Sequence, residues 1–195
     1  MNEQLKKFIE DNIELIENND WEKVYDKIFP TGFTDTLLEC DINPLELGLN
    51  YIPDRFLNNS KIKNFVIPNN IRKIGEWAFH WCINLTSITI PDSVTSIGDY
   101  AFYDCSNLTS IIIPDSVTSI GEWAFSGCSS LTSIEISNNV TSIGGYAFRD
   151  CHSLTEIKYI GTKEEALTKL EVKNKEWRKG SAIQKIICTD GEIEL

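Results

Sequence analysis

Apolar residues recur along most of this chain with a period of 23 residues, and each position of the period keeps its residue type. One unit reads Leu-x-x-Ile-x-Ile-Pro-x-x-Val-x-x-Ile-Gly-x-x-Ala-Phe-x-x-Cys-x-x. A cysteine and the leucine three residues after it mark the clear copies: Cys82 and Leu85, Cys105 and Leu108, Cys128 and Leu131, Cys151 and Leu154. A degenerate copy precedes them, with Phe56, Ile62 and Phe65 in register but Asn59 in the cysteine position. A fixed period of this length indicates a repeat protein.

Each part of the unit predicts an element. The alternation in Leu-x-x-Ile-x-Ile is typical of a strand with one buried face, and Pro91 or Pro114 then ends it because proline cannot donate to a ladder. Val-x-x-Ile-Gly predicts a second short extended piece that turns at the glycine. Ala-Phe-x-x-Cys has helical spacing, which would place phenylalanine and cysteine on the inward face of a helical turn. Coils stacked about 4.8 Å apart would align like residues in internal columns, so we expect an α/β solenoid of short strands and helical turns.

The unit resembles the BspA-like class of leucine-rich repeat, whose pattern includes Ile-Pro-x-x-Val-Thr-x-Ile-Gly-x-x-Ala-Phe-x-x-Cys. The resemblance covers residues 49–158 as five 23-residue coils, the first of them degenerate. It implies a leucine-rich-repeat solenoid with a parallel sheet and a role in protein or surface recognition. It implies no catalytic residues.

The two ends are expected to cap the solenoid, because terminal coils would otherwise expose their apolar columns. Residues 1–48 carry apolar stripes at helical spacing, one through Phe8 and Ile13 and one through Trp21 and Tyr25, which predicts an acidic α-helical N-terminal cap. Residues 159–195 predict a C-terminal cap of a helix plus a hairpin. The helix begins at a capping box opened by Thr162 and runs to about residue 171, and the strands of the hairpin cover 183–188 and 192–195.

The charge is strongly negative and unevenly distributed. The formal net charge is −11, and residues 1–60 carry 13 acids against 5 bases, whereas residues 158–195 carry 7 against 8. Such an acidic protein favours a basic protein partner and disfavours direct binding to nucleic acid or anionic lipid. No apolar run is long enough for a membrane span or a signal peptide, so we expect a cytoplasmic protein, or a secreted or surface protein if a signal has been removed.

The residue types that carry chemistry do not form a catalytic pattern. The cysteine column, which we define as Cys82, Cys105, Cys128 and Cys151, is expected to hold buried free thiols, because parallel side chains in a stack do not converge on a metal. The states of Cys40 and Cys188 stay open. The two histidines, His80 and His152, occupy different places in their coils. We therefore expect no enzyme activity, no metal site and no cofactor.

Two columns are candidates for partner binding. The outward column of the strands changes residue type from coil to coil while its neighbours do not, which is how a repeat protein varies its contact face. Its members are Val66, Thr89, Ile112, Glu135 and Lys158. The other is an aromatic ladder just before each Ala-Phe pair, which would offer flat apolar area if it is exposed. The ladder consists of Trp77, Tyr100, Trp123 and Tyr146.

These columns predict a protein–protein interaction module. Solvent positions without a role and a half-buried ladder are the plainer interpretations. One functional alternative is an intracellular inhibitor, perhaps phage-encoded, whose acidic surface blocks a basic, nucleic-acid-binding partner. A second is a surface adhesin or carbohydrate-binding protein. Because strand edges and terminal coils can pair between chains, a homodimer is also open.

Overall fold

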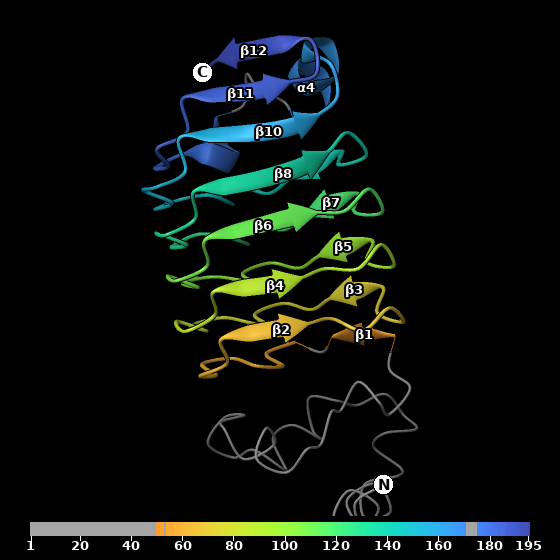
Figure 1. Ribbon diagram of the computed structural model, residues 1–195, viewed down its shortest axis with the longest axis vertical. Coiled ribbons are helices and arrows are strands. Elements are labelled where there is room, and N and C mark those ends of the chain that lie inside the picture. The colour runs from red at the N-terminus through yellow and green to blue at the C-terminus, as the bar shows by residue number, and fades with distance from the viewer. Residues whose placement is uncertain (1–49, 53, 171–174) are drawn as a thin grey trace, which may run out of the picture.

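The computed structural model describes residues 50–52, 54–170 and 175–195, and there the chain winds into a stack of coils (Figure 1). The N-terminal helical cap predicted for residues 1–48 lies outside the described residues. The expected solenoid of five coils is present, and most of its regular structure is β-strand.

One side of the stack is formed by the longer strands. They are β2 (Asn64–Val66), β4 (Ser87–Thr89), β6 (Ser110–Ile113), β8 (Ser133–Ser137), β10 (Glu156–Ile160), β11 (Lys185–Cys188) and β12 (Gly191–Glu194). Hydrogen bonds join β2 to β4, and join β6, β8, β10, β11 and β12 in that order. Neighbours are parallel except for β12, which returns antiparallel to β11. In β6 the burial alternates strictly, so one face of these strands is in the core and the other in solvent.

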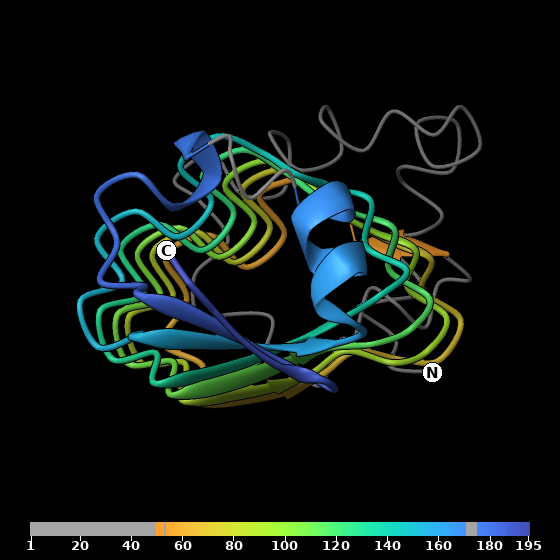
Figure 2. The ribbon, with the colours of Figure 1, turned by 90° about the horizontal axis from the view of Figure 1, so that it is seen from above.

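A second parallel sheet contains only two-residue strands. They are β1 (Tyr51–Ile52), β3 (Lys73–Ile74), β5 (Ser96–Ile97), β7 (Ser119–Ile120) and β9 (Ser142–Ile143). Seen along the stack, the coils superimpose around a common interior (Figure 2). Threonine hydroxyls add to the backbone bonds, since Thr118 Oγ1 donates to the Thr95 carbonyl and Thr141 Oγ1 donates to the Thr118 carbonyl. These bonds give the recurring threonines a structural role between coils.

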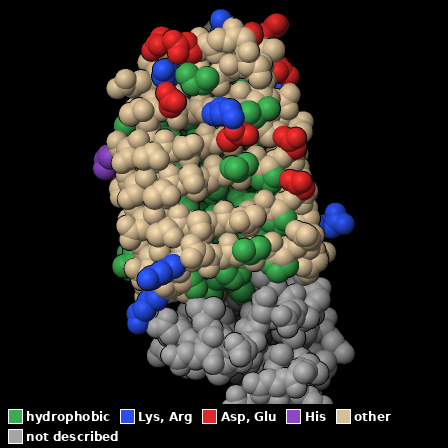
Figure 3. All heavy atoms as spheres, viewed as in Figure 1, with side chains coloured by type: hydrophobic (Ala, Val, Ile, Leu, Met, Phe, Trp, Pro, Cys, Tyr) green, Lys and Arg blue, Asp and Glu red, His purple; other side chains and the backbone are tan. Residues whose placement is uncertain are grey.

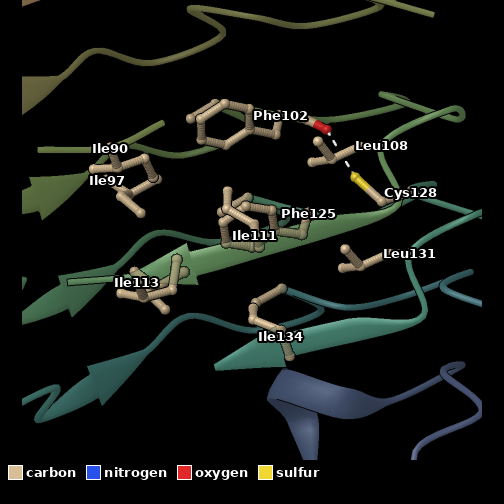
Figure 4. Packing of buried hydrophobic residues seen from close by; sticks show 14 of the residues in the cluster. Ile90, Ile97, Phe102, Leu108, Ile111, Ile113, Phe125, Cys128, Leu131 and Ile134 are labelled. Carbon is tan, nitrogen blue, oxygen red and sulfur yellow. Dashed lines mark hydrogen bonds between the residues drawn. The ribbon is translucent and has the colours of Figure 1, made fainter. Parts of the chain in front are cut away.

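The core consists of columns of like residues. Leu85, Leu108, Leu131 and Leu154 are all fully buried, as the repeat predicts. The phenylalanine rings of successive coils stack nearly parallel, with 5.2 Å between the centroids of Phe102 and Phe125. Figure 4 shows these residues filling the space between the two sheets. Because every coil covers the apolar face of the next, the burial that stabilises each coil comes from its neighbours.

The helical turn expected at Ala-Phe-x-x-Cys is wrong. The segment is a series of turns in which alternate backbone amides donate to the following coil, as Phe79 does to the Ala101 carbonyl over 2.7 Å. The amides between them close tight turns within the coil, as Cys82 does to the Phe79 carbonyl. Trp77 and Trp81 also have positive φ, which interrupts a right-handed helix. Lateral bonding between coils therefore replaces the bonds that a helix would make within itself.

The C-terminal residues form a sixth, longer coil. Tyr146 N–H donates to the Glu176 carbonyl, and the buried Trp177 packs edge-on against Phe148 at 6.0 Å. Strand β10 pairs with β11 through Ile157 and Ile186, an offset of 29 residues. The repeat thus continues past residue 159, but its register is hidden by the insertion of helix α4 (Lys163–Lys169).

Helix α4 covers the end of the core. Its capping box is present, with Thr162 Oγ1 accepting from Glu165 N–H and the Glu165 carboxylate accepting from Thr162 N–H. Ala166 is buried in the core cluster, and the helix lies over the interior when the molecule is seen along the stack (Figure 2). A 3₁₀ turn at Glu176–Arg178 follows, and the expected hairpin is formed by β11 and β12.

The first coil departs from the predicted register by one residue. Asn59 N–H donates to the His80 carbonyl, which aligns Asn59 with Trp81 and places the buried Ser60 level with Cys82. The cysteine position is therefore occupied by Ser60 and not by Asn59. The coil is one residue shorter in its turn, which a fixed 23-residue offset cannot register.

Candidate binding site

The outward column lies in a row on the solvent side of the longer strands, the long-strand face. Backbone pairing places Val66 beside Thr89, Ile112 beside Glu135 and Glu135 beside Lys158. Val66 and Ile112 are 71% and 66% exposed, although both are large aliphatic side chains. Glu135 and Lys158 form an ion pair with each other. The column thus divides into an apolar N-terminal part and a charged C-terminal part.

A shallow hollow of about 320 Å³ lies at the carboxyl ends of β4, β6 and β8. Thr89, Ile112 and Glu135 of the outward column line it, together with Asp92 and Asp115 from the turns that follow the strands. Both aspartates are exposed, and neither has an ion-pair partner among the residues that the structure describes. An exposed aliphatic side chain therefore stands beside three carboxylates, one of which is already paired with a lysine. Figure 3 shows apolar side chains in the middle of this face and charged ones toward its C-terminal end.

The aromatic ladder is half-buried, and its rings lie on one another. Trp77 and Tyr100 stack at 4.0 Å with 5° between their planes, and Trp123 and Tyr146 stack at 4.5 Å with 19°. All four residues have φ between 56° and 58°. Because each ring covers the face of its neighbour, the ladder presents mainly ring edges to solvent. The flat apolar area that the sequence suggested is largely used inside the ladder.

Three further aromatic residues lie next to the ladder and escaped the sequence analysis. The His80 ring stacks on Trp81 at 5.1 Å and on Tyr103 at 5.4 Å, and it meets Trp77 edge-on at 4.8 Å. Burial lowers the pKa of His80, and burial raises the pKa of Tyr103. These residues fill the two variable positions between phenylalanine and cysteine. Aromatic type at those positions in two successive coils was the signal that could have identified them. We call the ladder together with these three residues the aromatic flank.

Cations of the chain itself cover the C-terminal half of this flank. The Arg149 guanidinium lies 5.3 Å from the centre of the Trp123 ring and 5.7 Å from that of Tyr146. The Lys179 ammonium lies 5.4 Å from the Tyr146 ring centre and donates to its hydroxyl. Such contacts stabilise a cation by about 0.5–1 kcal/mol at exposed sites.

A second hollow, of about 420 Å³, lies over the short-strand sheet and is lined mainly by serine and glycine. Its glycines are required by the close approach of the coils. A Cβ on Gly144 would lie 2.3 Å from the Glu122 backbone nitrogen, whereas a Cβ on Gly145 would meet nothing within 4 Å. The hollow thus records backbone packing between coils.

The thiols of the cysteine column are free and fully buried. Each donates to a backbone carbonyl of the preceding coil, as Cys128 Sγ does to the Phe102 carbonyl over 3.2 Å (Figure 4). Burial raises the pKa of Cys151 to about 12 and raises those of Cys105 and Cys128 well above the ordinary value. A thiol held neutral in this way is a poor nucleophile and a poor metal ligand.

The remaining candidates for chemistry are scattered. Cys188 is a free, buried thiol, and Cys40 lies outside the described residues. His152 is exposed, whereas His80 Nδ1 hydrogen-bonds Asn58 Oδ1 at 2.9 Å. Across the described ranges no three His, Cys, Asp or Glu side chains could hold a metal ion. In the same ranges no helix has the length and apolar character to cross a membrane.

Comparison with known proteins agrees with this architecture. The family described as "BspA type Leucine rich repeat region" matches residues 50–169, more than half of the chain, in six copies. A leucine-rich repeat protein of T. pallidum is 32% identical with a TM-score of 0.54, over 56% of this chain and 52% of that one. A leucine-rich repeat protein from Bacteroides ovatus is 31% identical with a TM-score of 0.51, over 66% and 31%.

A leucine-rich cell surface protein from Faecalibacterium prausnitzii is 28% identical with a TM-score of 0.50, over 56% of this chain and 35% of that one. The chain therefore spans about half, or less, of the length of these structures. No curated protein matches the sequence.

Proposed function

The chain belongs to the BspA-type leucine-rich-repeat family, and from this premise we propose that it is a non-catalytic module that binds a partner protein through its long-strand face. Repeat proteins of this kind present rigid extended surfaces, and their specificity lies in side chains that the scaffold does not need. The outward column has this property here. The buried neighbours Ile111 and Ile134 keep their type, whereas Ile112 and Glu135 differ.

The exposure of Ile112 is the observation that carries the proposal. A 66% exposed isoleucine lies within a shallow hollow and next to Asp92, Asp115 and Glu135. Burying such a side chain against a partner yields about 25 cal/mol for each Å² of apolar surface removed from water. Neighbouring carboxylates favour a partner with lysine or arginine around its apolar anchor, because complementary charges steer association. The partner we expect is therefore a basic protein with an exposed apolar side chain.

A pair of lysine substitutions tests the proposal. Ile112→Lys removes the anchor and adds a cation that repels a basic partner, while Glu135 beside it can pair with the new lysine. Leu167→Lys is the control, because Leu167 is also a large exposed side chain, at 47%, but lies on α4. The partner would be identified with a photo-crosslinker at Thr89 and at the exposed Thr168 of α4 as the control position.

Titration of the crosslinked partner against the variants then decides. We expect Ile112→Lys to weaken binding at least tenfold, a loss of about 1.4 kcal/mol, and Leu167→Lys to have no effect. Equal affinities of all three proteins, or equal crosslinking from Thr89 and Thr168, would remove the long-strand face from the proposal.

An inhibitor with an acidic surface is the first alternative, and the charge imbalance of residues 1–60 motivates it. Its affinity would fall steeply with ionic strength, because many screened charges would carry the binding. Binding through Ile112 predicts a weaker dependence on salt. A complex that dissociates on a modest rise in salt, and that tolerates Ile112→Lys, would favour the inhibitor.

A surface adhesin or carbohydrate-binding protein is the second alternative, and the description of the F. prausnitzii relative as a cell surface protein motivates it. Sugar rings stack on open aromatic faces, whereas the rings of the ladder cover one another. Glycan binding that disappears in Trp77→Ala would favour this alternative.

A further inference from the structure

The aromatic flank is covered unevenly by the chain's own cations. Arg149 and Lys179 lie over the rings of Trp123 and Tyr146 in the C-terminal half. Over the N-terminal half, the described residues place no cation on Trp77 or Trp81. The repeat therefore carries the same kind of aromatic surface twice, once with a cation in place and once without.

Trp81 stands out within its own column. The equivalent positions in the other coils also have positive φ, and they are occupied by Asn59, Asp104, Gly127 and Asp150. Glycine, asparagine and aspartate adopt this conformation most readily, whereas a bulky side chain there costs about 1–2 kcal/mol. The tryptophan is 49% exposed, so burial does not offset that cost fully. A strained residue that packing does not require is a candidate for function.

The Trp81 ring is nevertheless held in one orientation. Its Nε1–H donates to Asp104 Oδ2 over 2.9 Å, and one of its faces lies on the His80 ring with 13° between the planes. His80 is itself fixed through Asn58. Since the ring is half-exposed, its opposite face is open to solvent. The result is a preorganised indole face with a carboxylate at its edge.

The charges around this half of the flank are mainly negative. Besides Asp104, the acids Glu76, Asp99 and Glu122 directly precede Trp77, Tyr100 and Trp123 in the chain. Within the described ranges none of these four carboxylates has an ion-pair partner. An indole face beside an unpaired carboxylate attracts a guanidinium or an ammonium group, through the ring and through the charge.

We propose that the N-terminal half of the aromatic flank is a second binding surface, on which Trp81 and Asp104 together receive an arginine or lysine side chain of a partner protein. The contact that Arg149 makes with Trp123 is its counterpart within the chain. Arginine is favoured over lysine, because its planar group can stack on the indole while it bonds the carboxylate. This surface is separate from the long-strand face, and its test does not depend on the partner of that face.

A peptide pair tests the proposal without knowledge of the partner. The probe is an acetylated and amidated hexapeptide of alternating arginine and glycine, and its control has neutral citrulline in place of arginine. The indole N–H resonance of Trp81, assigned by its loss in Trp81→Asn, is followed by NMR during each titration. We expect the arginine peptide to shift this resonance and the citrulline peptide to leave it in place.

Variants separate a specific contact from the attraction of any cation to an acidic protein. Trp81→Asn keeps the charge and suits the backbone, since Asn59 occupies the equivalent position with a φ of 59°. We expect it to weaken peptide binding about fivefold, the equivalent of ~1 kcal/mol for one cation–π contact. Asp104→Asn should weaken binding by at least as much. Glu194→Gln is the matched control, because it removes one exposed carboxylate from β12.

Three results would overturn the proposal. They are unchanged affinity in Trp81→Asn, equal losses in Asp104→Asn and Glu194→Gln, and equal binding of the two peptides. Self-association of the protein that is abolished by Arg149→Gln would also overturn it, because the cation would then come from a second copy.

Discussion

The sidedness of the long-strand face can be tested with one substitution at two adjacent residues. Ile111 and Ile112 are neighbours in β6, and the structure places the first in the core at 3% exposure and the second in solvent at 66%. Replacing each with threonine keeps a β-branched side chain, so the preference for strand changes little. Threonine already occupies the outward column at Thr89.

The expected losses differ because only one of the two side chains packs. At Ile111, threonine removes two buried carbons, worth ~0.8 kcal/mol each. It also buries a hydroxyl without a partner, which costs about 1–3 kcal/mol. The total of about 3–4 kcal/mol corresponds to a fall in Tm of roughly 6–16 °C for a chain of this size. At Ile112 the loss should stay within about 0.5 kcal/mol, the usual range for surface positions.

Thermal and urea unfolding followed by far-ultraviolet circular dichroism measure both losses. The ratio of the two losses is informative, since it does not depend on the absolute stability. Equal losses at Ile111 and Ile112 would mean that the strand does not present one residue to the core and the next to solvent. In that case the argument that Ile112 is free for a partner would fail too.

Three further outcomes follow from the packing. Because burial raises the pKa of Cys151 to about 12, its thiol should resist iodoacetamide at pH 8 and react only in urea, as mass spectrometry of the labelled peptides would reveal; rapid labelling of the folded protein would contradict this. Gly144→Ala should destabilise strongly in urea titrations, since its Cβ would lie 2.3 Å from the Glu122 nitrogen, while Gly145→Ala should be neutral, and equal effects would refute the close approach of the coils. Because burial lowers the pKa of His80, the unfolded state takes up its proton more readily, so stability should fall as the pH drops below about 6.5. His80→Gln should remove that part of the pH dependence, and an unchanged profile would count against the assignment.

The columns of the core were predictable because a solenoid makes its contacts between equivalent residues. Once the period is known, the neighbour of Leu108 must be Leu85 on one side and Leu131 on the other, and all three are buried. No long-range pairing has to be guessed. The same property made the strand registers predictable, as in the pairing of Ile111 with Ile134.

The failures occur where the period changes or where two structures share one spacing. The sixth coil has an offset of 29 residues, and Trp177 takes the place below Phe148, so self-comparison at 23 residues misses it. The Ala-Phe-x-x-Cys spacing fits a helical turn and also fits tight turns that bond sideways to the next coil. A pattern of apolar positions cannot separate these two, because both put Phe79 and Cys82 inside.

The binding residues were predictable only in part, for a reason that the left-handed positions make clear. A column with a strong packing demand reveals itself through constancy, and a column with none reveals itself through variation, as the outward column does. The column of Asn59, Trp81 and Asp104 belongs to a third kind, in which the demand falls on the backbone. In sequence it looks unconstrained, and Trp81 passes for one more variable residue. Only the torsion angles identify the tryptophan as the member that the fold does not favour, since the other coils supply the control that a single domain lacks. Strain relative to equivalent coils can therefore locate binding residues in a repeat protein when neither residue type nor periodicity does.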